Sequence, residues 1–511
     1  MTKTIHIGSP FTLYTILWIF LLQCPQLGFS QQVIRPDLPE VTPESSSKEV
    51  GRINTKETTR PNVLMISIDD LNDWVGYMGG HSQTQTPHLD ALAARGRAFT
   101  NAHCAVPVCS PSRISVISGL HATTHGSYEL GPSYSSIERL RDAPTLHSTF
   151  RQNGYQTVSG GKVLHHGFND RIAADVDLIL QKGRGGPRPD KPLHWTPRIW
   201  DYGPFPETDD LMLDMKLAKA AANYLQKPVD QPFFMSVGFF RPHVPMYVPP
   251  HWFDLFDVDR IELPEAPPWD MDDIPSNFQD MNQIAPAHAQ VQEAGQWRGF
   301  VQAYLASTAF VDHCVGTVLN GLAKGPHANN TVIVVWSDHG FHLGEKQHWA
   351  KRTLWEESTR VPLIFAGSGV QTAGPCAEAV SLIDIYPTLV EMCKLNSNSK
   401  LDGISLLPQV NNPNQTKARP AIISSFEGNH AIRSKHWRYI RYRDGSEELY
   451  DHRTDQQEFK NLAGDPKFKV IQAQLASHLP RDSAPEVKAK RDREANNEVL
   501  KKRRQAGGPV R

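Results

Sequence analysis

The chain has 511 residues, of which 39% are hydrophobic and 21% are charged, and its formal net charge is -1. This balance excludes a disordered or fibrous protein, and the length allows one large α/β domain with a smaller one. A nearly neutral chain gives no electrostatic reason to expect a nucleic-acid partner. An anionic ligand would instead need a local cluster of positive groups.

The N-terminus has the pattern of an export signal. Lys3 precedes an apolar run from Phe11 to Leu22, and small and polar residues follow it. This pattern predicts a signal peptide over residues 1–30 and an exported protein, either periplasmic, secreted or lumenal. The run is short for a membrane span of about 20 residues, so we expect no stable span in the mature chain. Residues 31–60 are rich in Pro, Ser, Thr, Glu and Lys, which favours a flexible leader.

The cysteine count indicates a special role for at least one thiol. Cys24 lies inside the predicted signal, and five cysteines remain after it. In an exported protein an odd number means that at least one does not form an internal disulfide.

Order is predicted to begin at the apolar run from Asn62 to Ile68, which is typical of a buried parallel strand. It ends in two carboxylates, Asp69 and Asp70. A helix should follow, with Thr86 as its N-cap, Pro87 in its first turn and Gly96 at its end.

A second buried strand is predicted from Thr331 to Trp336, and it ends in Ser337, Asp338 and His339. Further strand patterns cover 233–239 and 361–366, and helical patterns cover 211–226 and 385–393. This alternation favours an α/β fold with a mixed or parallel sheet covered by helices. Ligands of such sheets gather at the carboxyl ends of the strands, where both acidic clusters fall.

The pattern changes after about residue 410. Short strand-like pieces at 421–426, 431–434, 437–442 and 448–450 predict a small antiparallel sheet. We therefore expect a catalytic domain over 61–410, a C-terminal subdomain over 411–480 and a charged, solvated tail over 481–511.

The segment Cys109-Ser110-Pro111-Ser112-Arg113 carries the most specific chemistry. Ser110 can cap a helix and Pro111 can begin it, which places Cys109 beside a helix N-terminus. Such a position attracts anions. Arg113 adds a fork of donors suited to a tetrahedral oxyanion.

This pentapeptide resembles the Cys-x-Pro-x-Arg signature of the type I, formylglycine-dependent sulfatases. Other segments resemble the family's motifs in the same order: 62–70, 160–165, 337–340 with 343–345, 384–389 and 449–451. Within the family, 241–245, 339–345 and 349–351 resemble the iduronate 2-sulfatases. The resemblance implies an alkaline-phosphatase-like sandwich with a large mixed sheet flanked by helices.

Three carboxylates predict a metal site. Asp69, Asp70 and Asp338 offer oxygen ligands that suit hard cations such as Ca²⁺ or Mg²⁺. The resemblance adds His339 and the modified residue 109 to this shell. Imidazole is a softer ligand than calcium usually takes, but Ca²⁺ is the metal that we expect, with Mg²⁺ as the alternative.

The resemblance also implies a mechanism and the role of each residue. A formylglycine-generating enzyme would oxidise Cys109 to an aldehyde, whose hydrate attacks sulfur, expels the alcohol and then releases sulfate. Arg113 and Lys162 would hold the modified residue and the sulfate oxygens. His165 would take the proton during sulfate release. His243 and Lys351 would contact the sulfate and protonate the leaving oxygen, with His243 the expected acid.

The substrate implied is a sulfated polysaccharide or glycosaminoglycan-type saccharide. The family often has Thr-Gly-Arg after the signature helix, whereas this chain has Ser118-Gly119-Leu120. The basic loop over 181–191 either lines a groove for a polyanion or is solvated. Two other functions stay open: a phosphonate or phosphodiester hydrolase of the same superfamily, and a catalytically silent glycan-binding homologue. A zinc hydrolase is disfavoured because the sequence has no compact Cys/His cluster.

Overall fold

A computed structural model describes residues 60–165, 174–178, 185–276, 285–397, 399–416 and 419–488. The predicted signal peptide, the leader up to residue 59 and the tail beyond residue 488 lie outside the described residues. Within the described part of the chain, every helix is too short or too polar to cross a bilayer.

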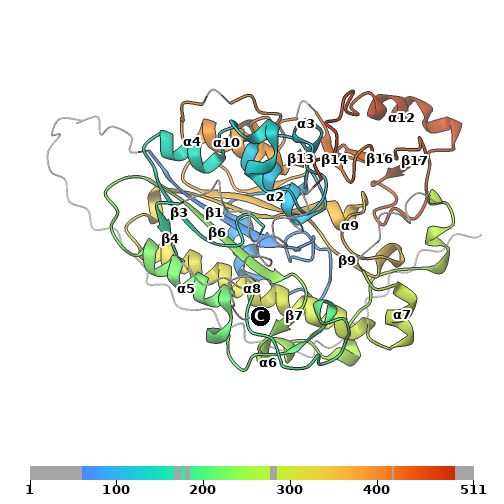
Figure 1. Ribbon diagram of the computed structural model, residues 1–511, viewed down its shortest axis with the longest axis horizontal. Coiled ribbons are helices and arrows are strands. Elements are labelled where there is room, and N and C mark those ends of the chain that lie inside the picture. The colour runs from blue at the N-terminus through green and yellow to red at the C-terminus, as the bar shows by residue number, and fades with distance from the viewer. Residues whose placement is uncertain are drawn as a thin grey trace, which may run out of the picture. The chain divides into compact units, whose positions relative to one another are not determined.

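A mixed sheet forms the centre of the described chain (Figure 1). Its nine described strands, in spatial order, are β12 (Gly374–Cys376), β2 (Arg97–His103), β11 (Arg360–Gly367), β8 (Thr331–Ser337), β1 (Asn62–Asp69), β6 (Phe233–Pro242), β3 (Gln156–Gly161) and β4 (Val176–Asp177), with β13 (Val380–Ser381) beside β2. β1 runs parallel to β6 and β8, whereas β11 is antiparallel to β8 and β2. The predicted α/β class with a large mixed sheet is confirmed.

Helices cover both faces of this sheet because the buried strands have two apolar faces. In β1, Leu64, Ile66 and Ile68 pack into one core, and Val63 and Met65 pack into the other. The first core is covered by α1 (Pro87–Arg95), α5 (Leu213–Leu225) and α8 (Trp297–Lys324), and the second by α2 (Cys109–Ser118), α4 (Leu146–Gln152) and α10 (Ile385–Met392). Figure 1 shows α5 and α8 on one side of the strands and α2, α4 and α10 on the other.

Shorter elements complete the described chain. The helices are α3 (Ala122–His125), α6 (Pro250–Phe253), α7 (His288–Glu293), α9 (Glu356–Thr359), α11 (Leu407–Asn411) and α12 (Lys469–Ala476), and two small strand pairs are β5 (Tyr202–Pro204) with β7 (Met246–Val248) and β9 (His342–Leu343) with β10 (Trp349–Ala350).

Two helix starts differ in detail from the prediction. Thr86 is the N-cap residue of α1, but its hydroxyl bonds to Gly76 N and Asp90 rather than to the helix's own amides. In α2 the N-cap position is Val108, so Ser110 lies within the first turn and does not cap the helix. Cys109 is consequently the first helical residue rather than its neighbour.

A smaller antiparallel sheet follows, as predicted. It consists of β14 (Ala421–Ser424), β15 (His430–Arg433), β16 (Trp437–Arg441) and β17 (Glu447–Asp451), in that order. Leu354 and Trp355, which lie just before α9, pack into its core. The domain boundary near residue 410 stays a prediction.

A buried ion-pair network joins the two sheets. Glu356 at the start of α9 pairs with Arg433 of β15 at 3.0 Å and also with Arg438 of β16. Burial raises the pKa of Glu356, but these two arginines and His452 outweigh it, so the pKa lies well below its usual range. The carboxylate thus remains charged at neutral pH and holds α9 against the small sheet.

The exchange Glu356→Ala leaves Arg433 and Arg438 buried without their shared counter-charge. We expect the free energy of unfolding to fall by about 3–5 kcal/mol, the usual cost of breaking a buried pair from one side. Urea denaturation measures this loss. The matched control is Glu378→Ala, which breaks a pair with Lys435, whose side chain is 49% exposed; it should cost about 0–1 kcal/mol. Equal losses in the two variants would contradict the role of the network.

Candidate functional site

Two neighbouring strands, β1 and β8, place four polar side chains at one edge of the large sheet. Asp69 is the last residue of β1, and Asp70 follows it with a left-handed φ of 64°. Asp338 and His339 follow β8, which is the neighbour of β1. Because parallel strands end at the same edge, these four side chains meet there.

Arg113 joins the ends of the two acidic strands. It lies in α2, four residues after Cys109, and is fully buried. Its Nε donates to Asp338 Oδ2 at 2.7 Å, and its Nη2 lies 3.4 Å from Asp69 Oδ1. Its Nη1 donates to Ser67 Oγ at 3.2 Å and to the carbonyl of Lys162. The guanidinium therefore holds the ends of β1, β8 and β3 together.

The Cys109 thiol lies at the centre of the cluster and is 1% exposed. Its Sγ is 3.1 Å from His339 Nε2, 3.1 Å from Lys351 Nζ and 3.9 Å from Asp70 Oδ1. Burial raises the pKa of this thiol, and the Asp69 charge raises it further. Cys104, Cys314, Cys376 and Cys393 are buried too, and none of the described cysteines forms a disulfide.

The donor set fits a divalent metal. Ligand atoms of Asp69, Cys109, Asp338 and His339 lie within 4.8 Å of one another, and so do those of Asp69, Asp70, Cys109 and His243. Asp70 Oδ2 is buried and has no hydrogen-bond partner among the described residues. An unpartnered buried carboxylate oxygen is costly, which favours a cation or a proton beside it. A set dominated by oxygen ligands suits a hard cation such as Ca²⁺.

Two lysine ammonium groups and one imidazole surround these carboxylates. Lys162, which follows β3, forms an ion pair with Asp69, and Lys351 Nζ lies 2.5 Å from Asp70 Oδ1. His243, which follows β6, has its Nε2 3.9 Å from Asp70 Oδ2 and 4.0 Å from Asp69 Oδ2. Burial raises the pKa of Asp69, but Lys162, His243 and Arg113 reverse the effect and hold it well below its usual range.

Asp70 differs electrostatically from its neighbour Asp69. Burial raises the pKa of Asp70 to about 7, an effect that Lys351 opposes and the Asp69 charge reinforces. Each of the two carboxylates nevertheless has a lysine partner, Lys162 for Asp69 and Lys351 for Asp70. The charged form is therefore more strongly favoured at Asp69 than at Asp70.

Several positioning residues have no signal in the sequence pattern. Tyr304 of α8 donates from its hydroxyl to the Asp70 carbonyl at 2.7 Å, and Ser112 Oγ donates to the Asp338 carbonyl at 2.5 Å.

The backbone around the predicted residue Lys351 is strained. Lys351 lies between Ala350, with φ 70°, and Arg352, with φ 85°. Left-handed conformations are unfavourable for such residues and occur at functional sites. This strained backbone directs the Lys351 ammonium towards Cys109.

The remaining features of the sequence prediction are His165, the basic loop over 181–191 and the residues at the end of α2. His165 lies three residues after Lys162 and is half-buried, and its part in sulfate release stays a prediction. Of the basic loop over 181–191, residues 181–184 lie outside the described residues. Gly119 ends α2 with a left-handed φ of 68°, and Leu120 packs against the apolar core beside that helix.

Comparisons with known proteins agree with this arrangement. The family described as Sulfatase matches residues 61–394, and the family described as N-sulphoglucosamine sulphohydrolase, C-terminal, matches residues 344–484. A sulfatase of Formosa agariphila is 37% identical, and the match covers 84% of this chain and 88% of that protein. A Delta 4,5-hexuronate-2-O-sulfatase of Bacteroides thetaiotaomicron is 29% identical, with 82% and 87% covered.

Solved structures show the same likeness. The structure of a 2-O GAG sulfatase is 26% identical to this chain, with a TM-score of 0.64, and the match covers 88% of this chain and 94% of that one. This likeness confirms the predicted alkaline-phosphatase-like sandwich. A family match over most of the length, with a relative above one-third identity, assigns the chain: it belongs to the sulfatases, the hydrolases of sulfate esters.

Proposed function

We propose that this sulfatase acts through a formylglycine made from Cys109, beside a divalent metal held by Asp69, Asp70, Asp338 and His339. The observation that supports this most strongly is the convergence of these groups on one sulfur atom. The Sγ of Cys109 lies within 3.1 Å of both His339 Nε2 and Lys351 Nζ. That sulfur marks the position of the oxygen that the matured residue would present to metal and substrate.

The metal, when bound, would lower the pKa of the attacking hydroxyl and stabilise charge on the sulfate oxygens. The hydrated aldehyde at position 109 would supply both that hydroxyl and a second one, which allows sulfate to leave. Ca²⁺ is the proposed metal because carboxylate oxygens dominate the ligand set, and Mg²⁺ is the alternative.

The protein's own cations would hold the sulfate. Carboxylates, backbone carbonyls and the Ser67 hydroxyl already occupy the donors of Arg113, so we assign it to positioning of the strand ends and of residue 109. Lys162 and Lys351 each have a buried ammonium directed at the acidic cluster. Fixed positive groups in a site that excludes water stabilise an anionic transition state strongly.

His243 is the proposed acid for the leaving oxygen. Its Nδ1 donates to the Val244 carbonyl at 2.5 Å, which directs Nε2 towards the cluster. Burial lowers the pKa of His243 well below its usual value, and Lys351 lowers it further, so the ring is neutral at pH 7. An anionic sulfate ester would favour the protonated ring, so proton uptake should accompany substrate binding. His165 is the proposed acceptor of the proton during sulfate release.

The proposed substrate is a sulfated polysaccharide or glycosaminoglycan-type saccharide, with sulfate at the 2-O position of a uronic acid as the first choice. Support comes from the relative described as a Delta 4,5-hexuronate-2-O-sulfatase and from the structure described as a 2-O GAG sulfatase. We also propose export through the signal pattern of residues 1–30 and maturation by a formylglycine-generating enzyme.

A panel of defined substrates tests the substrate class. We expect kcat/KM for an unsaturated 2-O-sulfated uronate disaccharide to exceed that for its 6-O-sulfated isomer and for an aryl sulfate. Differential contacts to the sugar should contribute at least one factor of ten, about 1.4 kcal/mol. Preference for an aryl phosphonate over every sulfate ester would support the phosphonate hydrolase alternative. Tight saccharide binding without turnover would support the silent glycan-binding alternative.

The nucleophile is tested by replacing Cys109 with Ser. A serine can accept sulfate but lacks the second hydroxyl that releases it, so we expect at most one turnover per chain. Quench-flow measurement of released alcohol should show a burst without a steady state. Mass spectrometry of the unsubstituted protein, produced with a maturation enzyme, should find an aldehyde at 109. Cys104 is also buried and lies five residues before Cys109, so it is the internal control and should keep its thiol. Full activity of Cys109→Ser would rule out the proposed nucleophile.

The role of His243 is tested by its dependence on the leaving group. His243→Ala should lower kcat for a saccharide sulfate by about 10²–10⁴, because general acid catalysis typically contributes that factor. With a nitrophenyl sulfate, whose leaving group needs no proton, the loss should be much smaller. His251→Ala is the matched control, since that side chain is 53% exposed. An equal loss for both leaving groups would exclude His243 as the acid.

A further inference from the structure

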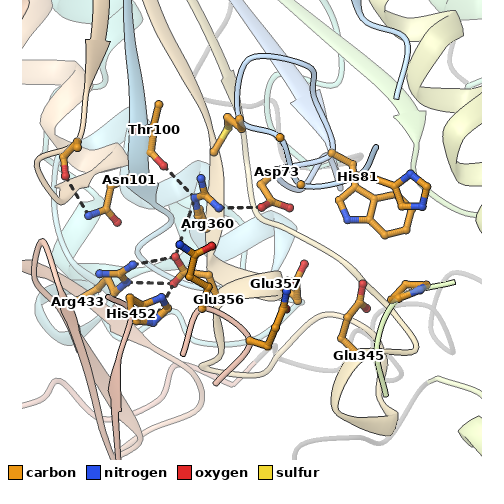
Figure 2. Close-up of a pocket in the computed structure, with 18 of the residues that line it drawn as sticks. Asp73, His81, Thr100, Asn101, Glu345, Glu356, Glu357, Arg360, Arg433 and His452 are labelled. Atoms are coloured by element: carbon orange, nitrogen blue, oxygen red, sulfur yellow. Dashed lines mark hydrogen bonds and ion pairs between the residues drawn. The ribbon is translucent and has the colours of Figure 1, made fainter. Parts of the chain in front are cut away.

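Cations at the carboxyl edge of the large sheet are held in two different ways. In a polar cavity of about 440 Å³ that is lined by residues of β2, β11 and the small sheet, Arg360 pairs with Asp73 at 2.8 Å (Figure 2). Arg433 pairs with Glu356 at 3.0 Å in the same cavity. Each guanidinium there has a carboxylate as its counter-charge. In the proposed active site, by contrast, an aromatic ring also contacts the cations, and that ring belongs to Phe240.

The Phe240 ring lies among three basic side chains. Phe240 belongs to β6 and is buried. The Lys162 Nζ lies 5.1 Å from the ring centroid, and the guanidinium carbon of Arg241 lies 5.6 Å from it. The centroid of the His243 ring is 4.7 Å away, with an angle of 42° between the two ring planes. Lys162 follows β3 and His243 follows the neighbouring strand β6, so one ring contacts side chains from two strand ends.

The backbone of Phe240 is fixed by α5. The carboxylate of Asp214 accepts hydrogen bonds from the Phe240 amide at 3.0 Å and from the Arg241 amide at 2.9 Å. Asp214 is buried and lies in the first turn of α5. These two bonds hold the end of β6 against the start of that helix.

A glycine packs directly against the ring. Gly185 has a left-handed φ of 75°, and a Cβ atom there would lie 2.7 Å from a ring carbon of Phe240 and 2.5 Å from Arg241 Nη1. Only glycine allows so close an approach. The Gly185 carbonyl accepts from the Leu213 amide at 3.1 Å, so the start of α5 also holds this backbone in place. The neighbouring backbone therefore leaves the ring little freedom to move.

An aromatic ring suits this position for an electrostatic reason. The π face attracts a cation, but the ring carries no net charge. A further carboxylate at this place would also hold Lys162, but it would repel an anionic sulfate ester. The ring thus holds the ammonium group and leaves its positive charge available to the substrate.

We propose that Phe240 is a positioning residue of this sulfatase, which fixes the Lys162 ammonium and the His243 imidazole relative to each other. This inference rests on the roles proposed above for these two side chains, the binding of sulfate and the protonation of the leaving oxygen. A displacement of about 1 Å in an active site can lower the rate by a factor of about 100. A rigid neighbour shared by both groups therefore has a kinetic effect, although it touches no substrate.

The binding of inorganic sulfate tests the contact with Lys162 without turnover. The matured, metal-loaded protein is titrated with sulfate by calorimetry. Phe240→Leu keeps an apolar side chain but removes the π face, so we expect the Kd for sulfate to rise about tenfold, within the range for a desolvated cation–π contact. Trifluorophenylalanine at position 240 keeps the shape of the ring but weakens its π face, and it should also raise the Kd. A Kd that changes in neither variant would overturn the proposal.

Kinetics with two leaving groups test the contact with His243. In Phe240→Leu we expect kcat for a saccharide sulfate to fall about tenfold and kcat for a nitrophenyl sulfate to fall less, because only the first leaving group needs a proton. If His243→Ala shows this dependence on the leaving group and Phe240→Leu does not, the positioning role is wrong and the acid role stands. If His243→Ala shows no such dependence, the acid role fails, and the sulfate titration alone decides the positioning role.

Phe239→Leu is the matched control. Phe239 precedes Phe240 in β6, is fully buried and packs into the apolar core that contains Ile68. Its exchange removes the same ring from the same strand, so the Tm should fall, while the Kd for sulfate and the ratio of the two kcat values should stay as in the unsubstituted protein. If Phe239→Leu changes both quantities as much as Phe240→Leu does, a general loosening of β6 explains the effect and the positioning role is contradicted.

Discussion

The structure depends on one electrostatic constraint, the burial of several carboxylates at the ends of β1 and β8. Asp69, Asp70 and Asp338 are all inaccessible to solvent. Water cannot compensate charge there, so the protein must do it with its own cations. Arg113 is the principal one, because its planar fork reaches both Asp69 and Asp338 from a single helix.

This compensation explains the arrangement of elements around the site. Arg113 can reach two strand ends only because β1 and β8 are parallel neighbours and α2 begins directly above them. Helix geometry then places Cys109, one turn earlier, over the same carboxylates. The spacing of the signature pentapeptide therefore places two side chains at the same strand ends: Cys109, the proposed precursor of the nucleophile, and Arg113, which neutralises the carboxylates.

Much of this could be predicted from the sequence, because the informative residues are local. Apolar runs that end in acidic residues predicted β1, β8 and their shared edge, and the pentapeptide predicted Cys109 and Arg113 at one helix N-terminus. The positions of Tyr304 and Ser112 could not be predicted, since each acts on a backbone carbonyl brought close only by folding. The capping predictions were wrong in detail: the Thr86 hydroxyl bonds to Gly76 N and Asp90 instead of the first helical amides, and α2 begins at Cys109, one residue before Ser110.

The segment from Phe341 to Thr359 connects the acidic cluster around Cys109 with the ion-pair network of α9. It begins beside His339, a proposed metal ligand, carries Lys351, and ends in α9, where Glu356 is fixed by Arg433 and Arg438. Lys351 lies between two left-handed residues, and such a backbone persists only when its surroundings hold it in place. Within the described chain, those surroundings include the ion pair of Lys351 with Asp70 and the ion-pair network around Glu356. The small C-terminal sheet thus supports the site around Cys109, because its arginines hold the end of the segment that carries Lys351.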